Sequence, residues 1–234
     1  MLSHLLELRR RALQCLGIFS AWFALFFFFA PNLFHLVVSP LLKVLPAQNG
    51  IIATQITSTV LTPLKLAADA ALLCTAPFVL LHAWRFVSPG LYRSERERFR
   101  WGLGGSLVLF GLGVIFCFYV VLPFMLQFFA RAIPEGVRLM PDMIYTVDFI
   151  TRMLLIFGLC FQVPLVCLVL IRLQIITVDT LKEIRPYIIV SAFILGMLLT
   201  PPDVFSQVMV AIPLCILYEM GIVLGTWFGP SRGT

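Results

Sequence analysis

Acidic residues in the segment 90–101 are the clearest candidates for binding chemistry in this chain. The segment reads GLYRSERERFRW and places Glu95 and Glu97 among four arginines. Ser94 and Glu97 have the spacing of a capping box, in which two side chains satisfy free backbone amides at the start of a helix. Glu95 lacks such a reciprocal partner, so its carboxylate is left to accept a guanidinium in a bidentate pair. We therefore expect Glu95 to bind a ligand and Glu97 to start a helix.

Glu7 is a second acidic candidate, and Arg9, Arg10 and Arg11 follow it closely. Its carboxylate could accept the same kind of cationic ligand. Alternatively, it pairs with Arg10 or Arg11, which lie three and four residues further along the same helix. The sequence is consistent with both interpretations.

Polar residues inside the long apolar runs are few, and in a membrane such residues are functional candidates. Asp69, Arg152 and Glu219 stand near the ends of runs, where we expect them to reach the membrane surface rather than to form a proton relay. Gln162 stands deep inside its run, two residues before Pro164. Since proline frees a carbonyl of the preceding turn, Gln162 either caps that loosened backbone or hydrogen-bonds a polar residue on a partner helix.

Motifs of enzymes and metal sites do not occur in the sequence. There is no Walker loop, no H-E-x-x-H and no G-x-S-x-G. The three histidines lack the spacing of metal ligands, and the six cysteines fall within or at the ends of apolar runs, where they behave as small apolar residues. We therefore expect a protein that is not an enzyme and that holds no cofactor or metal.

Composition assigns the chain to the membrane proteins. Of its 234 residues 61% are hydrophobic and only 12% are charged, and the mean hydropathy is +1.02. Soluble domains average about 25% charged residues. The apolar runs are continuous rather than alternating, which favours helices over a β-barrel. We predict an all-α integral membrane protein. The first 15 residues form a basic amphipathic segment without a cleavage site, so we do not expect a cleavable signal peptide.

Six apolar segments are expected to span the bilayer within a single membrane domain that covers residues 1–234. Their ranges are Leu16–Val38, Leu66–Val87, Leu103–Phe129, Phe149–Ile171, Tyr187–Leu199 and Val204–Phe228. The fifth has only 13 residues, or about 20 Å of helix, which is short for a hydrocarbon core of about 30 Å. It belongs either to a hairpin buried against other spans or to a region of thinned bilayer.

Basic residues indicate the orientation. Twelve of the seventeen lysines and arginines fall on the side that carries both chain ends, and five fall on the other. By the positive-inside rule, both termini lie in the cytoplasm.

Eight short motifs occur in an order that resembles a known family. They are HLLELRRRAL (4–13), SPLLKVLP (39–46), TPLKL (62–66), FVSPGLYRSER (86–96), FQVP (161–164), RPYIIV (185–190), LLTPPDVFSQ (198–207) and LYEMG (217–221). Together they look like the TatC family, the membrane subunits of the twin-arginine protein translocase. The motifs extend over nearly the whole chain.

The resemblance implies a receptor for folded cargo whose signal peptide carries two consecutive arginines. Family members work in the bacterial cytoplasmic membrane with TatB, recruit TatA, and depend on the proton-motive force. The implied fold has six helices in a concave bundle with short fifth and sixth helices. A homo-oligomer within a complex with TatB is expected, and no nucleic-acid partner.

Site residues follow from the same resemblance, position by position. The signal-contacting residues fall on Glu95, Phe86, Glu7 and Arg9, and the outer-face residues fall on Pro40 and Asp203. The polar residue of the fourth span, usually a glutamate in the family, is Gln162 here. A glutamine cannot ionise or relay a proton, so the implied role that remains is a polar contact with a partner helix.

A small secondary transporter or channel is the competing hypothesis. Such proteins usually show inverted repeats and charged sites near the membrane midplane. This chain shows no such repeat, and Gln162, its polar residue deepest in an apolar run, is neutral. A purely structural scaffold for other membrane subunits overlaps with the receptor interpretation.

Overall fold

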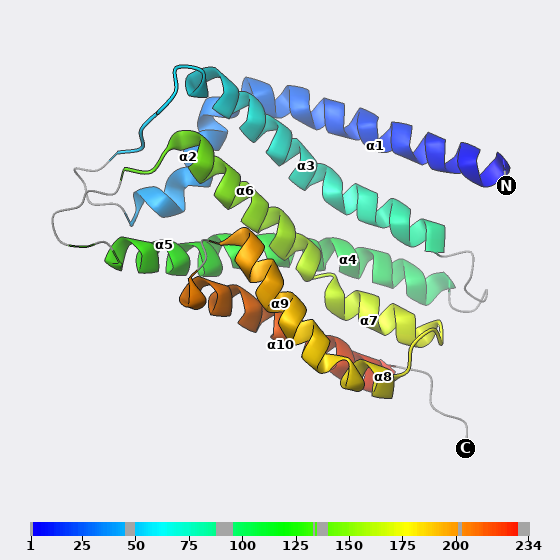
Figure 1. Cartoon of the computed structure of the whole chain (residues 1–234). Helices are drawn as coiled ribbons and strands as arrows, with labels where there is room; N and C mark the ends of the chain where they lie inside the picture. Colours follow the sequence, from blue (N-terminus) through cyan, green and yellow to red (C-terminus); the bar gives the residue numbers. More distant parts are fainter. Residues whose placement is uncertain are drawn as a thin grey trace. The chain divides into compact units, whose positions relative to one another are not determined.

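Helices make up the regular structure of this computed structural model (Figure 1). It describes residues 2–44, 50–87, 96–132, 134, 140–200 and 203–228, without the side chains of 2–6, 8, 83–87, 96–103 and 228. The elements are α1 (Leu2–Phe28), α2 (Ala30–Leu42), α3 (Ser58–Val87), α4 (Arg96–Phe116), the π-helical turn η3 (Cys117–Val121), α5 (Leu122–Arg131), α6 (Met143–Cys160), α7 (Val163–Arg172), α8 (Val178–Glu183), α9 (Arg185–Leu199) and α10 (Val204–Phe228). The prediction of an all-α membrane protein is confirmed for the described part of the chain.

Two compact units divide the chain. The first comprises Met1–Gly90 and Leu122–Leu155, and the second comprises Leu91–Val121 and Ile156–Thr234.

In the first unit, α1 and α3 lie side by side in opposite directions, so the start of α1 is next to the end of α3 (Figure 1). Helix α2 packs against α3 and α5. The first apolar segment was predicted as one span, Leu16–Val38, and this boundary prediction is wrong. Helix α1 already begins at Leu2 and ends at Phe28, and α2 starts after Phe29 with a proline in its first turn. Pro31 supplies no backbone N–H to the preceding turn, which explains the break.

Two connections of the first unit are joined at the end of the helices where α3 and α6 begin. The backbone N–H of Ile52 donates to the carbonyl of Pro141 (3.1 Å), and the N–H of Met143 donates to the carbonyl of Ile52 (2.9 Å). Together they form an isolated parallel bridge between Ile52 and Asp142. Segments almost ninety residues apart in the sequence are thereby held in one register.

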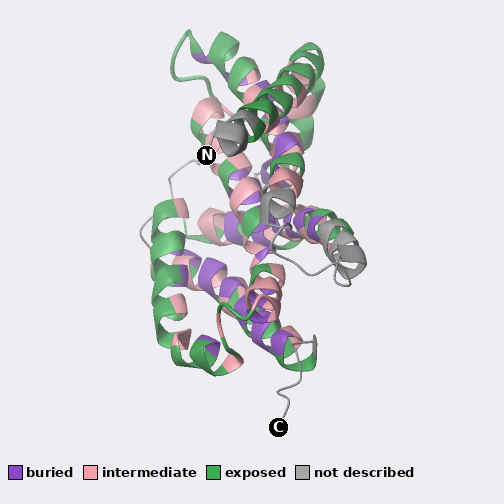
Figure 2. Cartoon of the chain, turned by 90° about the vertical axis from the view of Figure 1, so that its right-hand side faces the viewer, coloured by how far each residue is buried: buried purple, intermediate pink, exposed green. Residues whose placement is uncertain are grey.

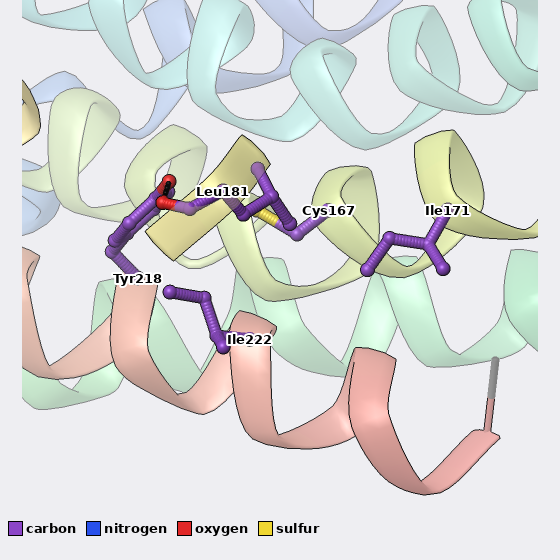
Figure 3. Packing of buried hydrophobic residues seen from close by; sticks show 5 residues of the cluster. All are labelled: Cys167, Ile171, Leu181, Tyr218 and Ile222. Atoms are coloured by element: carbon purple, nitrogen blue, oxygen red, sulfur yellow. Dashed lines mark hydrogen bonds between the residues drawn. The ribbon is translucent and has the colours of Figure 1, made fainter. Parts of the chain in front are cut away.

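The second unit is organised around α10, which packs against α7, α8 and α9. A buried cluster joins α7, α8 and α10, and Figure 3 shows its members Cys167, Ile171, Leu181, Tyr218 and Ile222. The hydroxyl of Tyr218 donates to the carbonyl oxygen of Leu181 (2.8 Å), so the polar end of the ring is satisfied inside the cluster. This cluster holds the short helix α8 against the ends of the longer helices.

Close approach of α7 and α10 depends on two glycines four residues apart. A Cβ atom on Gly221 would lie 3.0 Å from the Cβ of Cys167, and one on Gly225 would lie 2.1 Å from the Cδ1 of Ile171. Small residues at this spacing let membrane helices pack closely. The spacing Gly221–Gly225 is a helix-packing signal that the sequence analysis did not use.

Prolines also divide the later spans. The fourth predicted span is interrupted at Phe161 and Gln162, between α6 and α7, as the predicted effect of Pro164 requires. The third contains the π-helical turn η3, and Pro123 follows directly in α5. A π-helical turn shifts the hydrogen-bond register by one residue, which accommodates a proline without a donor.

The last two helices differ in length. Helix α9 has 15 residues and carries Pro186 in its first turn, a position where proline is favoured because its missing N–H would be unpaired in any case. It is therefore about 22 Å long. Helix α10 has 25 residues, or about 37 Å. The expectation that the sixth helix is short is therefore wrong, since Pro213 lies inside α10 without ending it.

Five helical stretches of the described chain are long and apolar enough to cross a membrane. They are Arg9–Phe28, Ser58–His82, Gly104–Arg131, Met143–Arg172 and Val204–Trp227, and α2 and α9 are shorter apolar helices. Figure 2 shows that most helices carry both buried and exposed residues. Many of those exposed side chains are large and apolar, such as Phe28 and Leu198. This arrangement suits a protein whose surrounding solvent is hydrocarbon.

Candidate functional site

Glu7 and Arg11 form an ion pair on the first turns of α1. Of the two interpretations of Glu7, pairing along its own helix is thus observed, with Arg11 as the partner. Arg11 also reaches across to α3, where its Nη1 donates to the carbonyl oxygen of His82 (2.9 Å). The side chain of Glu7 stays 50% exposed, so its carboxylate is accessible while it is paired.

The other residues expected to contact a signal peptide lie at the same ends of α1 and α3 or follow them in the sequence. Arg9 is exposed on α1. Phe86 lies one turn after His82 on α3, and its side chain is outside the described structure. Glu95 and the cap residue Ser94 also lie outside the described residues, and α4 begins at Arg96. The structure therefore brings Glu7 close to the end of the helix that carries Phe86.

Gln162 is buried at the break between α6 and α7, with only 4% of its surface exposed. Its amide forms a reciprocal pair with Ser106 of α4. The Ser106 hydroxyl donates to Oε1 of Gln162 (2.7 Å), and Nε2 of Gln162 donates to the Ser106 carbonyl (2.9 Å). The amide thus bonds a neighbouring helix of its own chain rather than the backbone loosened by Pro164.

Asp203 and Pro40 have local structural roles in the described structure. Oδ2 of Asp203 accepts a hydrogen bond from the backbone N–H of Ser206 (2.7 Å), which caps the start of α10. Its Oδ1 is buried and has no partner among the described residues. Pro40 lies inside α2 and is buried.

Charged residues of α3 and α6 form a network that the sequence analysis missed. Lys65 and Asp148 are 2.6 Å apart, and Arg152 lies 3.8 Å from the same carboxylate. Asp69 accepts a hydrogen bond from the hydroxyl of Thr151 (2.9 Å) and is partly buried. No sequence motif joins residues of two separate spans in this way.

Glu219 pairs with Arg185 at the start of α9 (2.7 Å). Each of the two side chains is nearly half exposed. An exposed pair of this kind contributes up to about 1 kcal/mol. It connects α9 to α10 at the end where α8 folds onto them.

Asp142 fixes the bridge between the two connections of the first unit. Its Oδ2 accepts hydrogen bonds from the hydroxyl and the backbone N–H of Thr54, and its Oδ1 accepts from the N–H groups of Ile144 and Tyr145. The hydroxyl of Thr54 is the main reason why the pKa of Asp142 lies below its ordinary value, and the backbone N–H groups lower it further. The carboxylate therefore holds both the bridge and the start of α6.

Metal-site and disulfide chemistry receive no support from the described residues. No group of three or more His, Cys, Asp or Glu side chains within them could hold a metal ion. All six cysteines are free, and Cys117 and Cys167 are buried.

Comparisons with known proteins agree along nearly the whole chain. The family model described as Sec-independent protein translocase protein (TatC) matches residues 3–213. The chain is 41% identical to the Sec-independent protein translocase protein TatC of Haemophilus influenzae, over 99% of this chain and 90% of that protein. For the same protein of Escherichia coli strain K12 the identity is 38%, over 97% and 88%.

A solved structure shares the fold. The crystal structure described as the twin arginine translocase receptor TatC aligns with a TM-score of 0.86 and 32% sequence identity, over 96% of this chain and 99% of that chain. Identity above 30% over almost the full length of both proteins, together with the matching family model, decides the assignment. The chain belongs to the TatC family of Sec-independent protein translocase proteins.

Proposed function

We propose that this protein is the receptor subunit of a twin-arginine translocase and that it binds the signal peptides of folded cargo. The observation that carries the proposal is the match, over 96% of the chain, with a structure described as the twin arginine translocase receptor. The exposed carboxylate of Glu7 beside the end of α3 agrees with a site for a cationic ligand.

Recognition in this proposal uses two carboxylates. The signal arginines approach the start of α1 and the end of α3, and one or both pair with Glu95, with Glu7 as a second acceptor. Arg9 contributes to the same surface, and the apolar stretch of the signal passes Phe86. A charge-assisted hydrogen bond contributes about 1.5–3 kcal/mol, so loss of Glu95 is expected to weaken binding about ten- to a hundredfold.

The arginines around Glu95 also have a role in this scheme. They repel cationic ligands that cannot match the geometry of a carboxylate, which improves discrimination. A lysine ammonium is a point charge, whereas a guanidinium binds a carboxylate with two parallel bonds. The proposal therefore predicts a preference for two arginines over two lysines in the signal.

We further propose that the protein acts with TatB and TatA as partners, as a homo-oligomer within a complex with TatB, and that export depends on the proton-motive force. In this arrangement it is a multi-pass protein of the bacterial cytoplasmic membrane with both termini in the cytoplasm. The twelve-to-five distribution of lysine and arginine supports that orientation. Pro40 and Asp203 then belong to the outer face.

Gln162 has a structural role in the proposed mechanism and no role in proton transfer. Because its amide is buried and already paired with Ser106, we propose that it supports partner binding by fixing the break between α6 and α7. A glutamine side chain does not ionise near neutral pH, so it cannot take up and release a proton as a carboxylate can. The proposed mechanism therefore assigns no proton transfer to this position.

Site-specific crosslinking of a twin-arginine signal tests the proposal. The signal carries a photoreactive group beside its arginines, and the full chain is present in native membranes with TatB. The Glu95→Gln variant should lose the crosslink and the export of a folded reporter, whereas Glu97→Gln, which keeps the neighbouring carboxylate, should retain both. Unchanged crosslinking and export in Glu95→Gln would show that the site is assigned wrongly, and solute flux without partners would favour a transporter.

A further inference from the structure

Arg11 is a largely covered cation near the start of α1. Its side chain is only 20% exposed, whereas Arg9 and Arg10 are exposed. One guanidinium serves two acceptors, because Nη2 donates to Oε1 of Glu7 and Nη1 donates to the carbonyl oxygen of His82 at 2.9 Å. The planar group of arginine can hold two acceptors in fixed directions, which a lysine ammonium cannot do in the same way.

The pairing leaves the Glu7 carboxylate half occupied. Arg11 binds Oε1, and Oε2 makes no hydrogen bond to the described residues, although the side chain is 50% exposed. A carboxylate has about four lone-pair positions. It can therefore keep Arg11 on one oxygen and accept a second guanidinium on the other.

The second contact of Arg11 fixes Glu7 relative to α3. His82 lies in the last two turns of this helix, one turn before Phe86. Helices α1 and α3 lie side by side in opposite directions (Figure 1), so the contact sets the position of Glu7 along the end of α3. A pair between Glu7 and Arg11 alone would be an exposed pair within one helix, which contributes little to stability. The bond to another helix gives the guanidinium a positional role.

We propose that Arg11 is a positioning residue for signal recognition, which holds one oxygen of Glu7 against the end of α3 and leaves the other oxygen open to a signal arginine. The inference rests on the proposed function, because it requires Glu7 to be a signal acceptor. Both Nη groups of Arg11 are already bonded, to Glu7 and to the His82 carbonyl, so Arg11 acts on the signal through Glu7 rather than by direct contact. Its charge also partly neutralises Glu7, so a ligand gains most from directed hydrogen bonds, which favours arginine over lysine.

The experiment measures equilibrium binding of a twin-arginine signal peptide and its twin-lysine counterpart to the full chain in lipid nanodiscs. The variants are Arg11→Gln, Arg11→Lys, Glu7→Gln and the double variant Arg11→Gln/Glu7→Gln. The matched control is Arg10→Gln, which removes the same charge from an exposed neighbour. Melting temperatures identify variants that fail to fold, and Arg11→Lys, which keeps the charge, then supplies the test.

Arg11→Gln should weaken binding of the twin-arginine peptide about three- to tenfold and bring its affinity closer to that of the twin-lysine peptide. Arg11→Lys should show most of this loss, because it cannot bridge both acceptors. The double variant should bind no more weakly than Glu7→Gln alone, since Arg11 acts through Glu7. A merely structural role would lower the melting temperature without changing the preference for arginine over lysine.

The inference is overturned if Arg11→Gln leaves affinity and preference unchanged, if Arg10→Gln has the same effect, or if the two single effects multiply in the double variant. A different result would refute the proposed function itself: unchanged binding of the twin-arginine peptide in both Glu95→Gln and Glu7→Gln. That result would also remove the basis of the inference about Arg11.

Discussion

Replacing Gln162 by leucine tests the account of the break between α6 and α7. The change keeps a side chain of similar size and removes both hydrogen bonds to Ser106, at 2.7 and 2.9 Å. Gln162 is 4% exposed and Ser106 is 1% exposed, so water does not replace the lost partners. Each bond contributes a net 0.5–1.5 kcal/mol as a rough range, and bonds between membrane helices average about 0.6 kcal/mol. We expect Gln162→Leu to lower the free energy of unfolding by about 1–3 kcal/mol.

The assay is reversible unfolding in mixed micelles at increasing SDS fraction, applied to Gln162→Leu, Ser106→Ala and the double variant. Ser106→Ala should cost about 0.5–1.5 kcal/mol, and the double variant should cost about 1 kcal/mol less than the sum of the two, because both singles break the same pair. The control is Ser191→Ala, whose hydroxyl bonds only its own helix at Tyr187 (2.8 Å). Effects of Ser106→Ala and Gln162→Leu that add within about 0.3 kcal/mol would refute the reciprocal pair.

Three further predictions concern single residues. A Cβ on Gly113 would lie 2.7 Å from a backbone oxygen of α6, whereas one on Gly111 meets nothing within 4 Å. Gly113→Ala should therefore lower the free energy of unfolding by about 1–3 kcal/mol. Equal effects of Gly113→Ala and the control Gly111→Ala in SDS unfolding would contradict the packing. Gln174 has a φ of 55° after the end of α7, so Gln174→Gly should stabilise the fold by about 0.5–1 kcal/mol, and a loss of stability in the same assay would contradict it. The folded-state pKa of Asp142 lies below its ordinary value of 3.8. Its hydrogen bonds to Thr54 should therefore persist at neutral pH and weaken as the pH falls through that lower pKa. Hydrogen exchange of the Thr54 amide should show this pH-dependent loss of protection in the wild type and not in Asp142→Asn.

Hydropathy was sufficient to predict the membrane class and the helical fold. Continuous apolar runs of about 20 residues have few other solutions in a bilayer, because every backbone polar group must be bonded within its own segment. The helix ends were less accessible to the same reasoning. The break at Phe29 lies within a stretch that is mostly apolar on both sides. Pro31 and Asn32 directly after it are the local signs of a break, but a proline can also be tolerated in a membrane helix.

The side-chain partners could be predicted where they lie on one helix and not where they lie on two. Pairing of Glu7 with Arg11 follows from a spacing of four residues, and the structure shows it. The partner of Gln162 could not be found in this way, because Ser106 lies 56 residues earlier on another helix. A lone serine in an apolar run has many possible partners, and its choice depends on helix packing. The glycine spacing Gly221–Gly225 was a usable packing signal that was overlooked.

The length of α10 shows how a resemblance can mislead in detail. The sixth helix was expected to be short because the family resemblance implied it. The apolar run Val204–Phe228 itself has 25 residues, which is enough to cross a bilayer core of about 30 Å. The residues were the better guide at this point, since Asp203 caps the helix start and no charged residue interrupts the run before Glu219.

The central claim is that this chain recognises paired arginines, and one binding measurement tests it most directly. The purified full chain in nanodiscs is titrated with a fluorescent twin-arginine signal peptide and with the same peptide carrying two lysines. The account predicts about ten- to a hundredfold tighter binding of the arginine peptide and loss of that preference in Glu95→Gln. Equal affinity of the two peptides for the unaltered chain would contradict the account.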